Sequence, residues 1–198
     1  MAIICAEPGL TGMVNLDPDC IALQQPGGIN KRIYIGSMAD VAGFTQNVEG
    51  ELLTIAMKTG KKLYTMSGQK LKNSTGNDLQ VNENSKLFGH TVTFLAYVSL
   101  QVEKNAIEGL SKVDDLFIIV ERNSGKLEAF GLIGDQETAS QGLSLTALAG
   151  GSGVALGDST AYTLTFSGAE TKLPVYTRFG ATRVAELTYL DTLLVAAV

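Results

Sequence analysis

The chain has one histidine, His90, which lies between Gly89 and Thr91 at the start of an alternating apolar segment. A histidine can act as a general base or bind a metal ion. A zinc site of the usual kind needs more histidine or cysteine ligands at short spacing, and none is close to His90 in the sequence. A Ser-His-Asp arrangement needs partners that a single sequence does not locate. We therefore expect His90 to have a structural role.

Three pairs of acidic residues are close enough in the sequence to be candidates for acid–base catalysis or calcium binding. They are Asp17 with Asp19, Asp114 with Asp115, and Glu121 with Glu128. The first pair lacks the further oxygen ligands, the glycine and the final glutamate of an EF-hand loop. The second is expected at a turn. The third flanks Arg122 and Lys126 across an expected hairpin, so cross-strand charge pairing explains it without catalysis.

Glycine clusters and cysteines give no stronger chemical signal. Gly131 to Gly134 and Gly150-Gly151-Ser152-Gly153 are not followed by the Gly-Lys-Ser/Thr of a phosphate-binding loop, so we interpret them as turns. Cys5 and Cys20 are the two cysteines, fifteen positions apart, and we expect reduced or partly buried thiols. The sequence thus predicts no catalytic, cofactor-binding or metal-binding residue and no cofactor, and it indicates a protein that is not an enzyme.

Two arginines near the end of the chain allow two interpretations. Arg178 and Arg183 flank Gly180 on what we expect to be C-terminal strands. They could form an ion pair with another subunit or lie at a solvated sheet edge. We favour the solvated edge.

Composition limits the partners. Of the 198 residues, 45% are hydrophobic and 18% are charged, which is a thin surface charge for a globular protein. The net charge of −5 argues against ordinary nucleic-acid binding, which depends on clustered Lys and Arg. The scarcity of charge indicates surface that meets other subunits.

The elements expected to hold these residues are mostly strands. The chain has 22 glycines and many Thr and Ser, which fits strands and turns better than long helices. The clearest stretch is a hairpin from Leu116 to Gly131 with its turn at Asn123-Ser124-Gly125, followed later by a strand at Ala161 to Phe166. Other strands are expected at 31–36, at 86–104 and in parts of 173–195. The segment 51–68 is expected to form one bent strand or a hairpin, and 142–151 could be a strand or an apolar loop. We expect a loop at 40–49, anchored by Phe44, and one short helix at 105–113, capped by Asn105.

The expected fold class is mainly β, a β-sandwich or barrel with that one helix. Residues 1–30 are rich in turn formers and predict an extended N-terminal arm, and residues 31–198 form a single β-rich domain. The strongly polar stretch 69–85 predicts a mobile loop or a protruding hairpin that contacts another subunit. The run Ala2 to Ala6 is too short for a secretion signal, and no apolar stretch is long enough to span a membrane, so we expect synthesis in a reducing cytoplasm.

Three segments carry a resemblance to a known family: Gly125-Lys126-Leu127-Glu128-Ala129-Phe130-Gly131, Gly153 to Glu170, and Pro174-Val175-Tyr176. Together with the order of elements, they resemble the tail tube (major tail) proteins of bacteriophages and related tubes of contractile injection machines. The resemblance implies rings of subunits, usually hexameric, that stack into a tube and share strands between neighbours. It implies other tail proteins as partners, transient non-specific passage of DNA through the lumen, no membrane, and a location in the virion tail.

Other assignments stay open on the sequence. The long arm departs from the family, which leaves a tail terminator, a connector ring or a capsid decoration protein. A carbohydrate-binding β-sandwich is a third class, although the chain has no Trp to form a sugar platform. If the tube lumen collects Asp and Glu, the passing genome would meet a repulsive wall.

Overall fold

The computed structural model describes residues 27–69, 72–82, 85–98, 100–132, 141–151 and 161–194, and within them the fold is mainly β, as expected. The strands are β1 (Ile29–Ser37), β2 (Val41–Gln46), β3 (Leu52–Met57), β4 (Tyr64–Ser67), β5 (Ser74–Asn82), β6 (Ser85–Tyr97), β7 (Leu116–Arg122), β8 (Leu127–Phe130), β9 (Ser144–Gly151), β10 (Ala161–Glu170) and β11 (Val175–Tyr176). The helices are α1 (Gln101–Leu110), α2 (Arg183–Thr192) and a short 3-10 turn, η2 (Met38–Asp40). The expected N-terminal arm lies outside the described residues apart from its last few positions.

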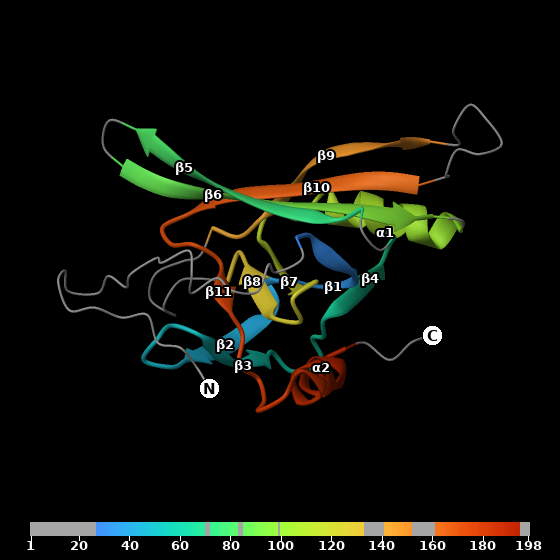
Figure 1. Cartoon of the computed structure of the whole chain (residues 1–198). Coiled ribbons are helices and arrows are strands. Elements are labelled where there is room, and N and C mark those ends of the chain that lie inside the picture. Colours follow the sequence, from blue (N-terminus) through green and yellow to red (C-terminus); the bar gives the residue numbers. More distant parts are fainter. Residues whose placement is uncertain are drawn as a thin grey trace.

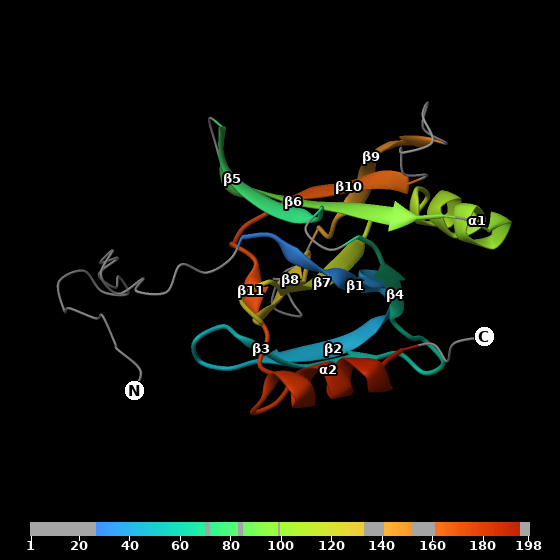
Figure 2. The same cartoon turned by 45° about the vertical axis from the view of Figure 1, so that its right-hand side comes forward.

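The described elements form three layers (Figure 1). A five-stranded sheet in the order β11-β8-β7-β1-β4 lies in the middle. A four-stranded sheet in the order β5-β6-β10-β9 covers one of its faces, and the pair β2-β3 with helix α2 covers the other. Figure 2 shows the same layering from a second direction, with α1 at one end of the four-stranded sheet.

The middle sheet is buried on both faces, and β7 shows why. Its sequence is almost continuously apolar, and all its residues except Arg122 are buried. Ile118 and Val120 point into the core shared with the four-stranded sheet, while Phe117 and Ile119 point into the core beneath β2, β3 and α2. Alternate side chains of a strand face opposite sides, so a strand between two cores needs apolar residues at every position.

The four-stranded sheet has one buried face and one outer face. On β6, Val92, Phe94 and Ala96 are buried, as the alternation from Val92 onward predicts. Leu164 and Phe166 of β10 lie beside them, since β10 pairs with β6 over ten residue positions. Complete burial of such aromatic side chains contributes about 1.5–3 kcal/mol each. The predicted strands here and the predicted hairpin β7–β8 are confirmed.

Helix α1 is present but begins and ends earlier than predicted. It runs from Gln101 to Leu110, and its first turn is stabilised by the Glu103 carboxylate, which accepts a hydrogen bond from the Leu100 backbone N–H at 2.8 Å. Asn105, the predicted cap, lies inside the helix. The strand predicted over 86–104 consequently ends at Tyr97. Ile107 of this helix faces the core.

The prediction of a single helix and of strands near the C-terminus is wrong. Apart from the two-residue β11, this part of the chain forms α2. Thr182 caps it, because its hydroxyl accepts a hydrogen bond from the Ala185 backbone N–H at 3.3 Å. Leu187 and Leu190 then pack into the second core one turn apart. The β-branched and aromatic residues that favoured strands are overridden by this packing.

Two further predictions are corrected. The loop predicted over 40–49 contains β2, although Phe44 does anchor it in the second core. The segment 51–68 is neither one bent strand nor a hairpin: β3 pairs with β2, whereas β4 pairs with β1 in the middle sheet. Gly60, with φ of +77°, lies in the connection between them.

The polar stretch 69–85 is largely strand rather than loop. Ser74 to Asn82 forms β5 and pairs with β6 along its whole length, so of the two alternatives the protruding hairpin is correct. Its tip extends past the middle layer in both views (Figures 1 and 2).

Candidate assembly interface

The four-stranded sheet has two long edges that the described chain leaves unpaired. β5 forms one edge and pairs with β6, and β9 forms the other and pairs with β10. Within the described residues no further strand lies against either edge. Every β9 residue from Thr146 to Gly151 is exposed. An unpaired edge presents a row of backbone N–H and C=O groups that can pair with another strand.

Charged residues and proline, which usually protect such edges, are scarce in these two, although β9 contains one bulge, at Thr146. Proteins often block an edge strand with Lys, with Pro or with inward-pointing charges. β5 has one charged residue, Asp78, and β9 has none, and neither strand contains Pro. Both edges are therefore suited to pairing with a strand from another molecule.

Strand direction makes the two edges match each other. All neighbouring strands in the sheet are antiparallel, and the sheet has four strands, an even number. β9 is therefore antiparallel to β5 of the same molecule. When two copies keep the same orientation, β9 of one also runs antiparallel to β5 of the next, so the alternation continues across the junction.

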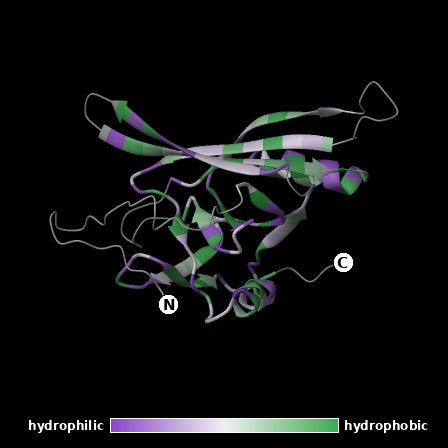
Figure 3. Cartoon of the chain, in the orientation of Figure 1, coloured by the Kyte–Doolittle hydropathy of each residue, from purple (hydrophilic) through white to green (hydrophobic). Residues whose placement is uncertain are grey.

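The outer face of this sheet carries mostly small, neutral side chains. Its central residues are Ser74, Gly76, Asp78 and Gln80 from β5, Thr91, Thr93 and Leu95 from β6, Thr163, Thr165 and Ser167 from β10, and Thr146, Ala147 and Ala149 from β9. Asp78 is the one charged side chain of this set, and in Figure 3 much of β10 has the pale colour of intermediate hydropathy. The face therefore carries hydroxyl groups rather than a cluster of acids.

His90 lies on the opposite, buried face of β6, with none of its surface exposed. Its Nε2 lies 3.0 Å from the Lys172 carbonyl oxygen, which assigns the ring proton to Nε2, and its ring packs edge-on against Phe130 at 5.7 Å between centroids. Its Nδ1 has no partner among the described residues. Burial lowers the pKa of His90 below its ordinary value. These contacts agree with the structural role that we expected.

The acidic residues of the hairpin β7–β8 form two separate ion pairs. Glu128 is buried and accepts two hydrogen bonds from Arg122, at 2.6 and 2.9 Å, which is the predicted pairing within the hairpin. Glu121 is also buried, but its partners are Arg183 of α2 and Asn30 of β1. Lys126 lies over the Tyr176 ring, at 4.9 Å from its centroid. Both carboxylates therefore hold elements together.

The two C-terminal arginines are placed differently from the prediction. Neither lies on a strand: Arg183 begins α2 and pairs with Glu121, and Arg178 contacts Glu51 at 3.4 Å. The predicted solvated edge is therefore wrong for Arg183, which makes an ion pair within the same molecule. Sequence spacing gave no signal of this pair, because the two residues lie 62 positions apart.

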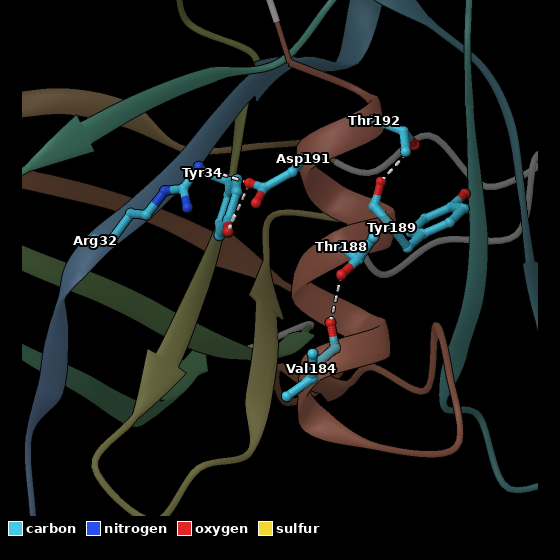
Figure 4. Close-up of polar contacts among 7 residues, drawn as sticks. All are labelled: Arg32, Tyr34, Val184, Thr188, Tyr189, Asp191 and Thr192. Atoms are coloured by element: carbon cyan, nitrogen blue, oxygen red, sulfur yellow. Dashed lines mark hydrogen bonds and ion pairs between the residues drawn. The ribbon is translucent and has the colours of Figure 1, made fainter.

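Figure 4 shows the second attachment of α2, on the middle sheet. Asp191 of α2 accepts a hydrogen bond from Arg32 at 2.6 Å and lies 3.4 Å from the Tyr34 hydroxyl. Burial raises the pKa of Tyr34 to about 12, so this phenol stays protonated in the physiological range. Tyr189 attaches α2 to β3 as well, because its hydroxyl accepts a hydrogen bond from the Ile55 backbone N–H and donates one to the Ile55 C=O, each at 3.0 Å.

A hollow of about 260 Å³ lies beside the start of α2, next to the ends of β8 and β11. Its walls include Lys126, Arg178 and Arg183, but also Glu51 and Glu186. Burial raises the pKa of Glu186, although a hydrogen bond from the Phe179 backbone opposes this. Since both arginines already bond carboxylates, the charges of the hollow are balanced by the protein itself.

The remaining predicted positions carry no site in the described chain. Asp114 and Asp115 lie between α1 and β7, and Gly131 has a φ of +76° in the turn after β8. The turn predicted at Gly150 and Gly151 is wrong, because both residues belong to β9 and pair with β10. Cys5, Cys20, Asp17, Asp19, Gly134 and Gly153 lie outside the described residues.

No cluster of three or more potential metal ligands occurs among the described side chains, and no helix in the described ranges is long and apolar enough to cross a membrane. No family model, curated protein or solved structure matches the chain.

Proposed function

We propose that this chain is a structural virion protein that assembles into stacked rings and forms the tail tube of a bacteriophage. The observation that supports this most is the four-stranded sheet with two open, nearly uncharged edges. Its neutral outer face and the resemblance of residues 125–131, 153–170 and 174–176 to tail tube proteins support it further.

In the proposed ring, β9 of each copy pairs with β5 of the next. The two edges have similar lengths, eight and nine residues, so one junction can satisfy most of the exposed backbone groups of both. Each copy offers two different edges, which makes the contact heterologous, and such contacts close into rings when the rotation between copies allows it.

The outer face of the sheet would line the lumen. A wall of Thr, Ser and Ala side chains, without Lys or Arg in the set named above, gives the phosphates of passing DNA no cations to bind. Conduction of the genome would then rest on a hydrated wall of low charge rather than on a strongly acidic one.

The proposal is tested with a double variant of one edge, Ala147→Glu with Ala149→Glu. Both alanines are exposed on β9, so the fold should tolerate the change, whereas the two new carboxylates would lie on the outer face at the junction and repel Asp78 of the neighbouring copy. We expect rings or tubes of uniform diameter for the natural sequence and monomers for the variant, measured by negative-stain electron microscopy and mass photometry.

A matched control is Ala56→Glu. Ala56 is an exposed strand alanine as well, but it lies on β3 in the two-stranded sheet. This variant should assemble like the natural protein. A natural protein that stays monomeric at high concentration, or a double variant that assembles normally, would contradict the proposal.

The same images separate a tail tube from the other virion roles. A tube subunit forms long stacks, whereas a connector or terminator forms single rings and a decoration protein binds capsids without stacking. Immunogold labelling along the whole tail of particles would support the tube.

A further inference from the structure

Near the tip of the hairpin β5–β6, apolar side chains are exposed. Leu79 is 57% exposed and Val81 is 62% exposed, although both point to the same side of the sheet as the buried core. Phe88 and Lys86 lie opposite them on β6. The tip projects beyond the middle layer in both views, which leaves this side without a covering element among the described residues (Figures 1 and 2).

An apolar groove lies at the opposite end of the molecule, between β4 and α1. It encloses about 350 Å³ and is lined by Thr65, Met66, Ser67, Ala96, Tyr97, Val98, Glu103, Ala106 and Ile107. Tyr97 is 47% exposed, and Val102 of α1, at 67%, lies one turn before Ala106. β4 is also the edge strand of the middle sheet, and next to the groove only an isolated bridge, from Gly68 to Ala96 of β6, joins its end to another described strand.

The two surfaces match in chemistry as well as in position. Among the described residues, the strands next to the tip present branched aliphatic side chains and the cation Lys86, and the groove lining is largely apolar with one anion, Glu103. An exposed apolar patch rimmed by charge is typical of a protein interface. Because the surfaces lie at opposite ends, one molecule cannot join them, but two molecules in line can.

We propose that the β5–β6 tip of one copy docks into the β4–α1 groove of a second copy, head to tail. This contact runs along the strands of the four-stranded sheet, whereas the β5–β9 junction runs across them. The two contacts are therefore independent and compatible, and the end-to-end contact would join one ring to the next. The inference rests on the proposed function in that its partner is another copy of the chain.

The contact is tested directly by cross-linking. A photoreactive benzoylphenylalanine replaces Val81 in the otherwise natural chain, and mass spectrometry locates the cross-linked residues in a mixture of ¹⁴N- and ¹⁵N-labelled protein. We expect mixed-label cross-links from position 81 to residues 65–67 or 96–107. Absence of such links, or links to another surface, would overturn the inference.

A head-to-tail contact joins two different surfaces, so the tip and the groove can be removed in separate variants. A symmetric contact would use the same surface on both molecules. A tip variant, Leu79→Glu with Val81→Glu, keeps its groove, and a groove variant, Ala106→Arg, keeps its tip. Ala106 is exposed, so neither variant removes a buried side chain, and thermal melts check that both fold. Each variant alone should stop end-to-end growth, and an equal mixture should form pairs that grow no further, measured by mass photometry and electron microscopy.

The outcomes separate this inference from the proposed function. Long tubes from either variant alone, or a mixture that does not pair, would overturn the head-to-tail contact even if rings form. Cross-links at position 81 without any rings would keep this contact and contradict the tube.

Discussion

At the scale of single residues, His90 is a buried base with one hydrogen bond. Its neutral form fits, because Nε2 donates to the Lys172 carbonyl and Phe130 packs against the ring. Protonation would place an unpaired charge in the core between the two larger sheets. The pKa of His90 in the folded state therefore lies below its ordinary value of 6.5 in the unfolded chain.

This difference predicts how stability depends on pH. Below pH 6.5 the unfolded chain binds a proton at His90 more readily than the folded protein, so stability falls as pH decreases from 6.5 through the folded pKa. The limiting slope from one such group is about 1.4 kcal/mol per pH unit. Urea unfolding of the natural protein and His90→Gln between pH 7.5 and 5 measures it.

The His90→Gln variant is the reference that cancels the contributions of the other titratable groups. Glu186, whose pKa is raised, contributes in the opposite direction, since its extra stability is lost as pH rises from 4.5 through its folded pKa. Both proteins contain Glu186, so the difference between their slopes isolates His90. Equal slopes in the two proteins would show that His90 does not titrate differently on folding.

At the scale of elements, Gly68 is the point where β4 of the middle sheet meets β6 of the four-stranded sheet. Its backbone forms a bridge with Ala96, and a Cβ at this position would overlap the Leu95 carbonyl and the Phe94 ring. Backbone cannot move aside as a flexible side chain can, so a side chain at Gly68 would force the two sheets apart locally.

A pair of glycine substitutions tests this. Gly68→Ala should destabilise the protein by about 1–3 kcal/mol, as overpacking in a core does. Gly109→Ala is the comparison, because a Cβ at Gly109 meets nothing within 4 Å and Gly109 lies in α1, where alanine is favoured by about 0.5–1 kcal/mol. Guanidinium unfolding of both variants measures the two effects, and a neutral Gly68→Ala would contradict the overlap.

The elements that the sequence predicted well are those whose pattern matches their environment. The alternation at Val92, Phe94 and Ala96 predicts a strand with one buried face, and the apolar run of β7 predicts a strand between turns. β5 was harder, because its Gly, Asn and Asp residues favour turns and its stability comes from pairing with β6. For α2, Thr182 and the spacing of Leu187 and Leu190 were usable helix signals that Val184, Thr188 and Tyr189 obscured.

The candidate interface could not be predicted in the same way. A strand pattern gives the faces of a strand but not its neighbours, so the order β5-β6-β10-β9, and with it the two open edges, depends on pairings between distant segments. The same holds for the groove between β4 and α1, whose walls come from residues 65–67 and 96–107. Tertiary arrangement brings these together.

At the scale of the whole molecule, one sheet separates two cores. The first core contains Phe166 of β10, and the second contains Leu190 of α2. These side chains lie on opposite sides of the middle sheet and belong to different clusters, which is the condition for independent energetic effects.

We expect additive losses when both cores are weakened. Phe166→Ala should cost about 3–5 kcal/mol and Leu190→Ala about 2–5 kcal/mol. The double variant, where it still folds, should lose the sum of the two within about 0.5 kcal/mol. Phe166→Leu with Leu190→Val provides a milder cycle, and a coupling above 1 kcal/mol in denaturant titrations would show that the middle sheet transmits strain between the layers.

The extra residue in β9 has a consequence for the size of the proposed ring. Thr165 pairs with Ala147 but Phe166 pairs with Leu145, so Thr146 is a bulge, and bulges increase the local twist of a sheet. Hydrogen bonds at a β9–β5 junction are the same for any number of copies, so they cannot count subunits. The angle through which each four-stranded sheet turns would set the number of subunits in the ring. Deletion of Thr146 would therefore alter the circumference of the ring while the same edges still join.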